Sequence, residues 1–271
     1  MLVLALLALS IGVTGCPKPR DVVPNPWLVP FQERHGSAVS RSQMRAMVRL
    51  AQMYRERGLK DEYLRALTTA VELYAGDTEV TYQLLNELIG MINKSRSDVS
   101  QRKALLSRMG IDASSLSTGS LPADDPARRE AQAYLESREK LEALYEETYR
   151  ILSTACGQIP YNAELYYRTA HLQYLRAEED GDRDKYKDAI NFLKRAIASD
   201  SSHLESYHLI ALAYERLGDT DRAMRFWRLF EVVYEIAPET VGEGFLTPER
   251  EQLHREALRH LESLGAADST G

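Results

Sequence analysis

Cysteine is nearly absent from this chain of 271 residues, which has only Cys16 and Cys156. The two thiols are far apart in the sequence and form no Cys-x-x-Cys element, the unit on which the common structural zinc sites are built. The sequence therefore excludes a zinc site of that kind, and the fold has to be stabilised mainly by packing.

Basic residues are fewer than acidic residues in this chain. The 34 Lys and Arg residues are outnumbered by 40 Asp and Glu residues, which gives a formal net charge of −6. The basic residues are scattered, and no run of five or more occurs. Because nucleic-acid binding needs a concentrated basic surface, we do not expect nucleic acid as a partner.

Motifs that carry catalysis or bind a metal are missing as well. The sequence contains no H-E-x-x-H, G-x-S-x-G, P-loop or G-x-G-x-x-G pattern. His203 and His208 are five residues apart, and His254 and His260 are six apart, so neither pair presents two ligands on one side of a helix. We expect no catalytic residue, metal, cofactor or small-molecule substrate.

Two local features invite a chemical interpretation but favour a structural one. The acidic segment 178–184 faintly resembles a calcium-binding loop, yet Lys185 and Asn191 stand where such a loop needs Gly and Glu. We expect a solvated insertion between helices. Cys156 ends an apolar helical face that starts at Leu152, which predicts a buried structural thiol rather than a nucleophile.

Long hydrophobic runs are absent except for one short stretch at the N-terminus. Leu2–Val13 is too short to cross a bilayer as a helix, which takes about 20 residues. With Thr14, Gly15 and Cys16 after it, the stretch is typical of a secretory signal peptide. It resembles a bacterial lipoprotein signal, and this implies that residues 1–15 are removed and that Cys16 is lipidated. An ordinary cleaved signal peptide is the alternative.

The segment after Cys16 is rich in proline. Residues 16–40 contain half of the ten prolines of the chain: Pro17, Pro19, Pro24, Pro26 and Pro30. Such a segment favours polyproline II, which rises about 3.1 Å per residue and acts as a semi-rigid spacer. We interpret residues 16–40 as a tether. If Cys16 is lipidated, Cys156 is the single remaining thiol, which excludes an intramolecular disulfide.

From residue 41 onward, apolar residues recur at helical spacing. Met47, Leu50, Ala51 and Tyr54 form one such stripe, and Gly58 ends it. In an N-terminal region of residues 41–111, the expected helices are 42–57, 61–74, 78–93 and 97–109. A polar segment rich in Ser and Asp, residues 112–125, is expected to be a linker.

A second helical region is predicted over residues 126–264. Asp125-Pro126 is a typical helix start, and no Gly or Pro interrupts the sequence up to Ala155. This indicates either one long helix or two helices with a break near Ser137. Thr247-Pro248 starts a last helix that is predicted to end near residue 264, and residues 265–271 are expected to be a disordered tail.

The chain also repeats itself with a period of 34 residues. Ala189 begins A-x3-L and Ala223 begins A-x3-W, 34 residues later. Residues 207–214 read Y-x2-I-A-x2-Y, and residues 47–54 read M-x2-L-A-x2-Y. These patterns resemble the tetratricopeptide repeat (TPR) family. The repeats suggested in this way are 44–77, a degenerate one that opens at Thr81 and has Ala104 in its second helix, 163–203 and 204–237.

The resemblance implies an all-α fold, a TPR-like right-handed α-solenoid of helix hairpins with a C-terminal capping helix. In this family the concave surface comes from fixed positions of each repeat's first helix. In the first repeat these are Arg45, Val48, Gln52 and Arg55. In the last two repeats they form the implied partner-binding groove: Glu164, Tyr167, His171, Tyr174, Glu205, His208, Leu212 and Glu215. Aromatic, imidazole and carboxylate groups together suit an extended peptide.

Together these features predict a lipid-anchored protein of the cell envelope that binds a protein or peptide partner as a scaffold or assembly factor. Pro17 after Cys16, in place of Asp, favours the outer membrane, facing the periplasm. TPR-like lipoproteins of this size include pilotins and a component of the β-barrel assembly machinery, and either role fits. An envelope enzyme of the hydrolase type, using Cys156 or the acids of 178–184, is the competing class.

Overall fold

The computed structural model describes residues 29–117, 127–242 and 244–268, and within these ranges the regular structure is entirely helical. Side chains are described for residues 40–117, 127–242 and 244–265. The helices are α1 (Val29–Glu56), α2 (Lys60–Leu73), α3 (Thr78–Arg108), the short 3-10 helix η1 (Ala113–Ser115), α4 (Arg128–Gln158), α5 (Ala163–Asp180), α6 (Arg183–Ser199), α7 (Leu204–Arg216), α8 (Thr220–Val241) and α9 (Pro248–Asp268).

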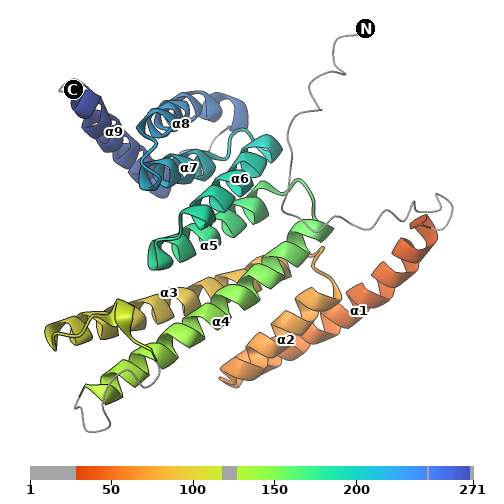
Figure 1. Cartoon of the computed structure of the whole chain (residues 1–271). Helices are drawn as coiled ribbons and strands as arrows, with labels where there is room; N and C mark the ends of the chain where they lie inside the picture. Colours follow the sequence, from red (N-terminus) through yellow and green to blue (C-terminus); the bar gives the residue numbers. More distant parts are fainter. Residues whose placement is uncertain (1–28, 118–126, 243, 269–271) are drawn as a thin grey trace.

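Successive helices pack as hairpins that stack on one another (Figure 1). The four hairpins are α1–α2, α3–α4, α5–α6 and α7–α8, and α9 packs against both α7 and α8. This arrangement confirms the predicted TPR-like all-α solenoid with a capping helix at its C-terminal end. Among the described residues, none of the helices has the length and apolar character needed to cross a membrane.

Side-chain caps fix where several helices start. Asn162 accepts a hydrogen bond from the backbone N–H of Leu165 at 3.0 Å, and Asp219 accepts one from Arg222 at 3.1 Å. Each cap satisfies a backbone donor that the first helical turn leaves without a partner. Gly218 precedes α8 with φ +73°, a left-handed conformation that glycine adopts without strain.

The α3–α4 hairpin differs from the prediction. The break expected between residues 93 and 97 is absent, because that stretch contains neither Gly nor Pro and α3 continues through it. Ala104 therefore lies on α3 itself, and the second helix of this hairpin is α4. Helix α4 is a single long helix, and the hydroxyl of Ser137 within it donates to Asp98 of α3 at 2.6 Å.

Boundaries near the two ends also differ. Helix α1 begins at Val29, inside the range expected as a tether. Pro30 then occupies the first turn, where its missing N–H costs no intrahelical hydrogen bond. At the other end α9 runs to Asp268, four residues beyond the predicted end.

Several predictions fall partly or wholly outside the described residues. They are the signal at 1–15, the lipidation site Cys16, the N-terminal part of the tether, the linker from residue 118 and the last three residues of the tail. The described part of the linker is not wholly polar loop, since it contains η1 and the buried side chain of Ala113.

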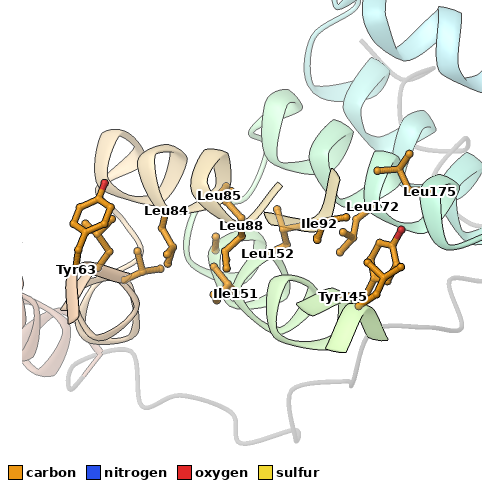
Figure 2. Close-up of a cluster of buried hydrophobic side chains, with 14 of the residues drawn as sticks. Tyr63, Leu84, Leu85, Leu88, Ile92, Tyr145, Ile151, Leu152, Leu172 and Leu175 are labelled. Carbon is orange, nitrogen blue, oxygen red and sulfur yellow. The ribbon is translucent and has the colours of Figure 1, made fainter. Parts of the chain in front are cut away.

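The core is divided along the stack, and α5 belongs to two of its parts. Figure 2 shows the first part, in which buried side chains from α2, α3, α4 and α5 meet, among them Leu172 and Leu175 of α5. Other residues of α5, such as Ala170 and Tyr174, belong to a second cluster with α6, α7 and α8. A third cluster lies between α7, α8 and α9.

Candidate functional site

Two of the predicted groove residues, Tyr167 and His171, lie together on α5. The rings of Tyr167 and His171 stack with centroids 5.9 Å apart, as expected for residues four apart on a helix. The Tyr167 ring also lies 5.2 Å from the ring of His203, the residue that precedes α7. Both Tyr167 and His171 remain partly exposed.

A row of contacting polar and charged side chains, which we call the ladder, lies beside these rings and consists of Arg168, Glu164, His203, Glu205 and Arg250. Arg168 donates to Glu164 at 2.5 Å, and Nε2 of His203 lies 3.3 Å from the other oxygen of Glu164. Nδ1 of His203 lies 3.6 Å from Glu205, which accepts a hydrogen bond from Nε of Arg250 at 2.8 Å. The ladder joins α5, α7 and α9 and holds both carboxylates in place.

The ladder and the burial of its neighbours set the charges on this side. Burial alone would raise the pKa of Glu164, but the hydrogen bond with His203 and the charge of Arg168 outweigh it and lower that pKa. Burial, together with the positive charge of Arg96, lowers the pKa of His171. The site is therefore a neutral pair of rings next to an ionised carboxylate.

The C-terminal half of the predicted groove is covered by α9. His208 is buried, with its ring edge-on to Trp227 at 5.1 Å and its Nε2 3.4 Å from Glu256 of α9. Glu215 accepts a hydrogen bond from Nε1 of Trp227 at 2.6 Å and lies 3.0 Å from Nδ1 of His260 on α9. Helix α9 of the same chain therefore contacts His208 and Glu215, which the sequence predicts to contact a partner.

Two further groove residues serve packing in this structure. Leu212 is half-buried between the second and third core clusters. Tyr174, which the groove position predicts to be partly exposed, is only 6% exposed. Its ring packs edge-on against Tyr186 of α6 at 5.4 Å, and Nε of Arg216 donates to its hydroxyl at 3.4 Å. The predicted exposure of Tyr174 is wrong because α6 covers it.

Four of the eight predicted residues therefore form an accessible surface. We call Glu164, Tyr167, His171 and Glu205 the α5–α7 face. The corresponding positions of α1 lie at the far end of the stack, where Arg45, Gln52 and Arg55 are exposed and Val48 is half-buried. Whether any of these residues binds a partner stays a prediction.

The groove positions alone do not reveal three residues of the ladder: Arg168, His203 and Arg250. Arg168 carries a readable signal, because an Arg four residues after Glu164 on a helix is placed to pair with it. His203 and Arg250 carry none, since their approach to Glu164 and Glu205 depends on how α7 and α9 pack.

The other candidate residues have structural surroundings. The thiol of Cys156 is partly buried, and its Sγ lies 3.7 Å from Oγ1 of Thr169. The acidic segment 178–184 is mostly helical rather than an insertion between helices. Helix α5 runs to Asp180 and is capped by Gly181, and Asp182 caps α6 by accepting a hydrogen bond from the backbone N–H of Asp184 at 2.9 Å. Within the described part of the chain, no group of three or more His, Cys, Asp or Glu side chains is placed to hold a metal ion.

No protein-family model matches the sequence, and no curated protein matches it. Among solved structures, MamA is similar at 14% identity over 82% of this chain and 95% of MamA, with a TM-score of 0.40. MamA from Desulfovibrio magneticus RS-1 is 15% identical over 71% of this chain and 96% of that one, with a TM-score of 0.32. TTC0263, a TPR protein from Thermus thermophilus, is 21% identical over 79% and 98%, with a TM-score of 0.36. At these values the matches assign the chain neither a family nor a function.

Proposed function

We propose that this protein binds another protein or peptide through the α5–α7 face and acts as a scaffold or assembly factor. The observation that carries the proposal is the stacked, partly exposed ring pair of Tyr167 and His171, held beside the carboxylates of Glu164 and Glu205. Rings that are already fixed lose little conformational freedom on binding, and aromatic anchors contribute much of the binding energy at many interfaces.

Each part of the face has a role in this proposal. The ring pair offers an apolar platform for one or two side chains of an extended peptide. The ladder holds two carboxylates on either side of His203, where they can accept hydrogen bonds from peptide N–H groups or pair with a basic side chain. Because Arg168 and Arg250 already pair with these two carboxylates, the face carries little net charge, and the ring pair is expected to contribute most to partner selection.

The test compares the double variant Tyr167→Ala/His171→Ala with the full-length wild type. We expect capture of crosslinked partners to fall more than about tenfold, because truncation at a hot spot costs about 2 kcal/mol or more. Tyr161→Ala is the matched control, since Tyr161 is 82% exposed and lies outside the face. Partner capture that stays at the wild-type level, with the helical circular dichroism signal intact, would place the binding surface elsewhere.

The setting of this function rests on the N-terminal sequence. We place the protein in the cell envelope, anchored through lipid on Cys16, with the outer membrane facing the periplasm as the site that Pro17 favours. A pilotin-like role for an outer-membrane complex suits an anchored protein of this fold, and a role in β-barrel assembly is the alternative.

Cys16→Ser tests the anchor. Stable attachment of a lipoprotein needs more than one acyl chain, so loss of the acylated thiol is expected to release the protein from membranes. The measurement is incorporation of labelled fatty acid together with the fraction of protein that sediments with washed membranes. Cys156→Ser is the control and is expected to keep both. A Cys16→Ser protein that still sediments after a salt wash would contradict lipid anchoring.

A further inference from the structure

The outer face of α8 carries an exposed apolar stripe. Leu229, Val232 and Ile236 are 36%, 48% and 54% exposed, and their spacing of three and four residues aligns them along one side of the helix. The opposite side of α8 holds the buried Trp227 and Phe230, which pack toward α7 and α9. Figure 1 shows α7 and α9 beside α8 at the C-terminal end of the stack.

Charges flank this stripe in a fixed order. Arg225 and Arg228 precede it toward the N-terminal end of α8, and Glu235 and Glu239 lie toward the C-terminal end. All four side chains are exposed, and at 100° per residue they fall on the same side of the helix as Val232. The face therefore carries two arginines before its apolar middle and two glutamates after it, with Asp221 on the same side one turn before Arg225.

We propose that a second copy of this chain packs on the stripe, with the two α8 helices antiparallel about a two-fold axis near Val232. In this register Val232 meets its own copy, and Leu229 meets Ile236 of the second copy. Arg228 then faces Glu235 of the second copy, and Arg225 faces Glu239 of the second copy. The contact between the two Val232 side chains lies on the axis, and every other contact occurs twice, as a two-fold interface requires.

The order of charges along α8 favours a second copy of this chain in the antiparallel orientation. A parallel pair of α8 helices would place Arg beside Arg and Glu beside Glu, which is unfavourable. The antiparallel pair converts the same residues into four attractive contacts around an apolar centre. The surface also has a shallow hollow lined by Asp221, Met224, Arg225, Arg228, Leu229 and Val232. In the proposed register this hollow receives Ile236 of the second copy.

The contact is small compared with a typical stable interface of about 1,600 Å². We therefore expect weak self-association that depends on protein concentration and decreases as salt screens the charges. The α8 stripe lies on a different helix from the α5–α7 face, so the two proposals stand or fall separately.

Cysteine crosslinking tests the register. The background is the full chain with Cys16→Ser and Cys156→Ser, to which Val232→Cys is added. Because Val232 lies on the axis, this variant is expected to form a disulfide-linked dimer on mild oxidation. Arg225→Cys is the matched control on the same side of α8, because its counterpart in the second copy would lie about 20 Å away along the helix. Equal crosslinking of the two variants, or none with Val232→Cys, would overturn the proposed register.

Charge reversal tests the complementarity by sedimentation velocity over a concentration series. Arg225→Glu/Arg228→Glu makes all four flanking positions acidic, and Glu235→Arg/Glu239→Arg makes all four basic. Each variant is expected to self-associate at least about tenfold more weakly, because like charges then face one another. A mixture of the two variants is expected to associate again, as is the single chain that carries all four changes.

Misfolding of a variant can be told apart from a loss of self-association. The substituted side chains on α8 are all exposed, and circular dichroism checks that each variant, including the Cys16→Ser/Cys156→Ser background, is folded. A wild-type chain that stays monomeric throughout the series would overturn the proposal. So would a dimer whose affinity is unchanged by the charge reversals or is not restored in the mixture.

Discussion

His208 shows how much a single residue's role depends on its surroundings. Burial lowers the pKa of this imidazole, His260 lowers it further, and the nearby Glu256 offsets only part of the shift. The folded state therefore prefers the neutral ring, which packs against Trp227 and Phe230. The pKa of His171 is lowered as well, with burial as the main cause.

The sign of the resulting pH dependence follows from these directions. A histidine whose folded pKa lies below its unfolded value of about 6.5 contributes its full stability above that pH, and this is lost as the pH falls. We predict that the midpoint temperature of thermal unfolding decreases as the pH is lowered from about 7.5 to about 5, a range that lies above the one in which carboxylates titrate. His208→Gln is expected to show a weaker dependence, and an identical slope in both proteins would contradict this account.

At the residue scale the sequence predicts packing better than binding. The small residues Ala51, Ala170, Ala189, Ala211 and Ala223 are expected at close helix contacts, and all are 0–1% exposed. Their repeat spacing reports directly on helix stacking. The groove positions Tyr174 and His208 follow the same spacing but are buried, because a position on one helix does not reveal which later helix covers it.

At the scale of elements, α9 is the part whose contribution is most open to test. It packs the fully buried Ala257 against α7 and α8 and pairs His254 with Glu231 and His260 with Glu215. Its His254 ring also stacks on Tyr234 with centroids 4.0 Å apart.

Ala257→Asp is predicted to release α9 while the first two core clusters stay folded. A carboxylate placed in the apolar contact between α7, α8 and α9 would be buried without a partner. The expected result is rapid limited proteolysis within residues 248–268, read out by mass spectrometry. Leu258→Asp is the neighbouring control, because Leu258 is 41% exposed. Equal protection of α9 in both variants would show that it does not depend on this contact.

The existence of the capping helix is predictable from Thr247-Pro248 and the pattern that follows, and the structure contains it. The sequence does not reveal where this helix packs. Its position depends on long-range pairs such as Arg250 with Glu205 and His260 with Glu215, which are 45 residues apart in each case. The prediction divides α3 too early for a similar reason, since weak periodicity between residues 93 and 97 does not end a helix that α4 supports.

On the scale of the whole molecule, α5 joins the two halves of the stack. Leu172 faces the cluster shared with α3 and α4, while Tyr174 and Ala177 face α6 and α7. In a helical repeat protein, stability is a sum of local terms and of contacts between neighbouring repeats. A helix that carries both sets of contacts should make the two halves unfold together.

Leu172→Ala tests this coupling. Leu172 is 2% exposed, so its truncation is expected to cost about 2–5 kcal/mol of unfolding free energy. In a Trp27→Phe background the single remaining tryptophan, Trp227, reports on the C-terminal end. We predict that denaturant midpoints measured by Trp227 fluorescence and by circular dichroism shift together. A midpoint for Trp227 that stays at its original value would show that the halves unfold independently.

The overall architecture is accessible from the sequence because the 34-residue period specifies which helices are neighbours. The relative lengths of the helices in the stack cannot be predicted from this period. Helices α3 and α4 have 31 residues each, against 13 for α7, and Figure 1 shows their outer ends extending past α5. In that outer part, Arg102 lies 3.6 Å from Glu130, and Val99, Leu106 and Tyr134 are buried.

The length of the α3–α4 hairpin can change in evolution independently of the other repeats. Because its outer part is built from contacts between α3 and α4, removing or adding about two turns in both helices at once would preserve its seam and leave the stack unaltered. Relatives of this chain are therefore expected to differ by paired insertions or deletions of about seven residues in these two helices, while the spacing of Ala189 and Ala223 stays at 34 residues.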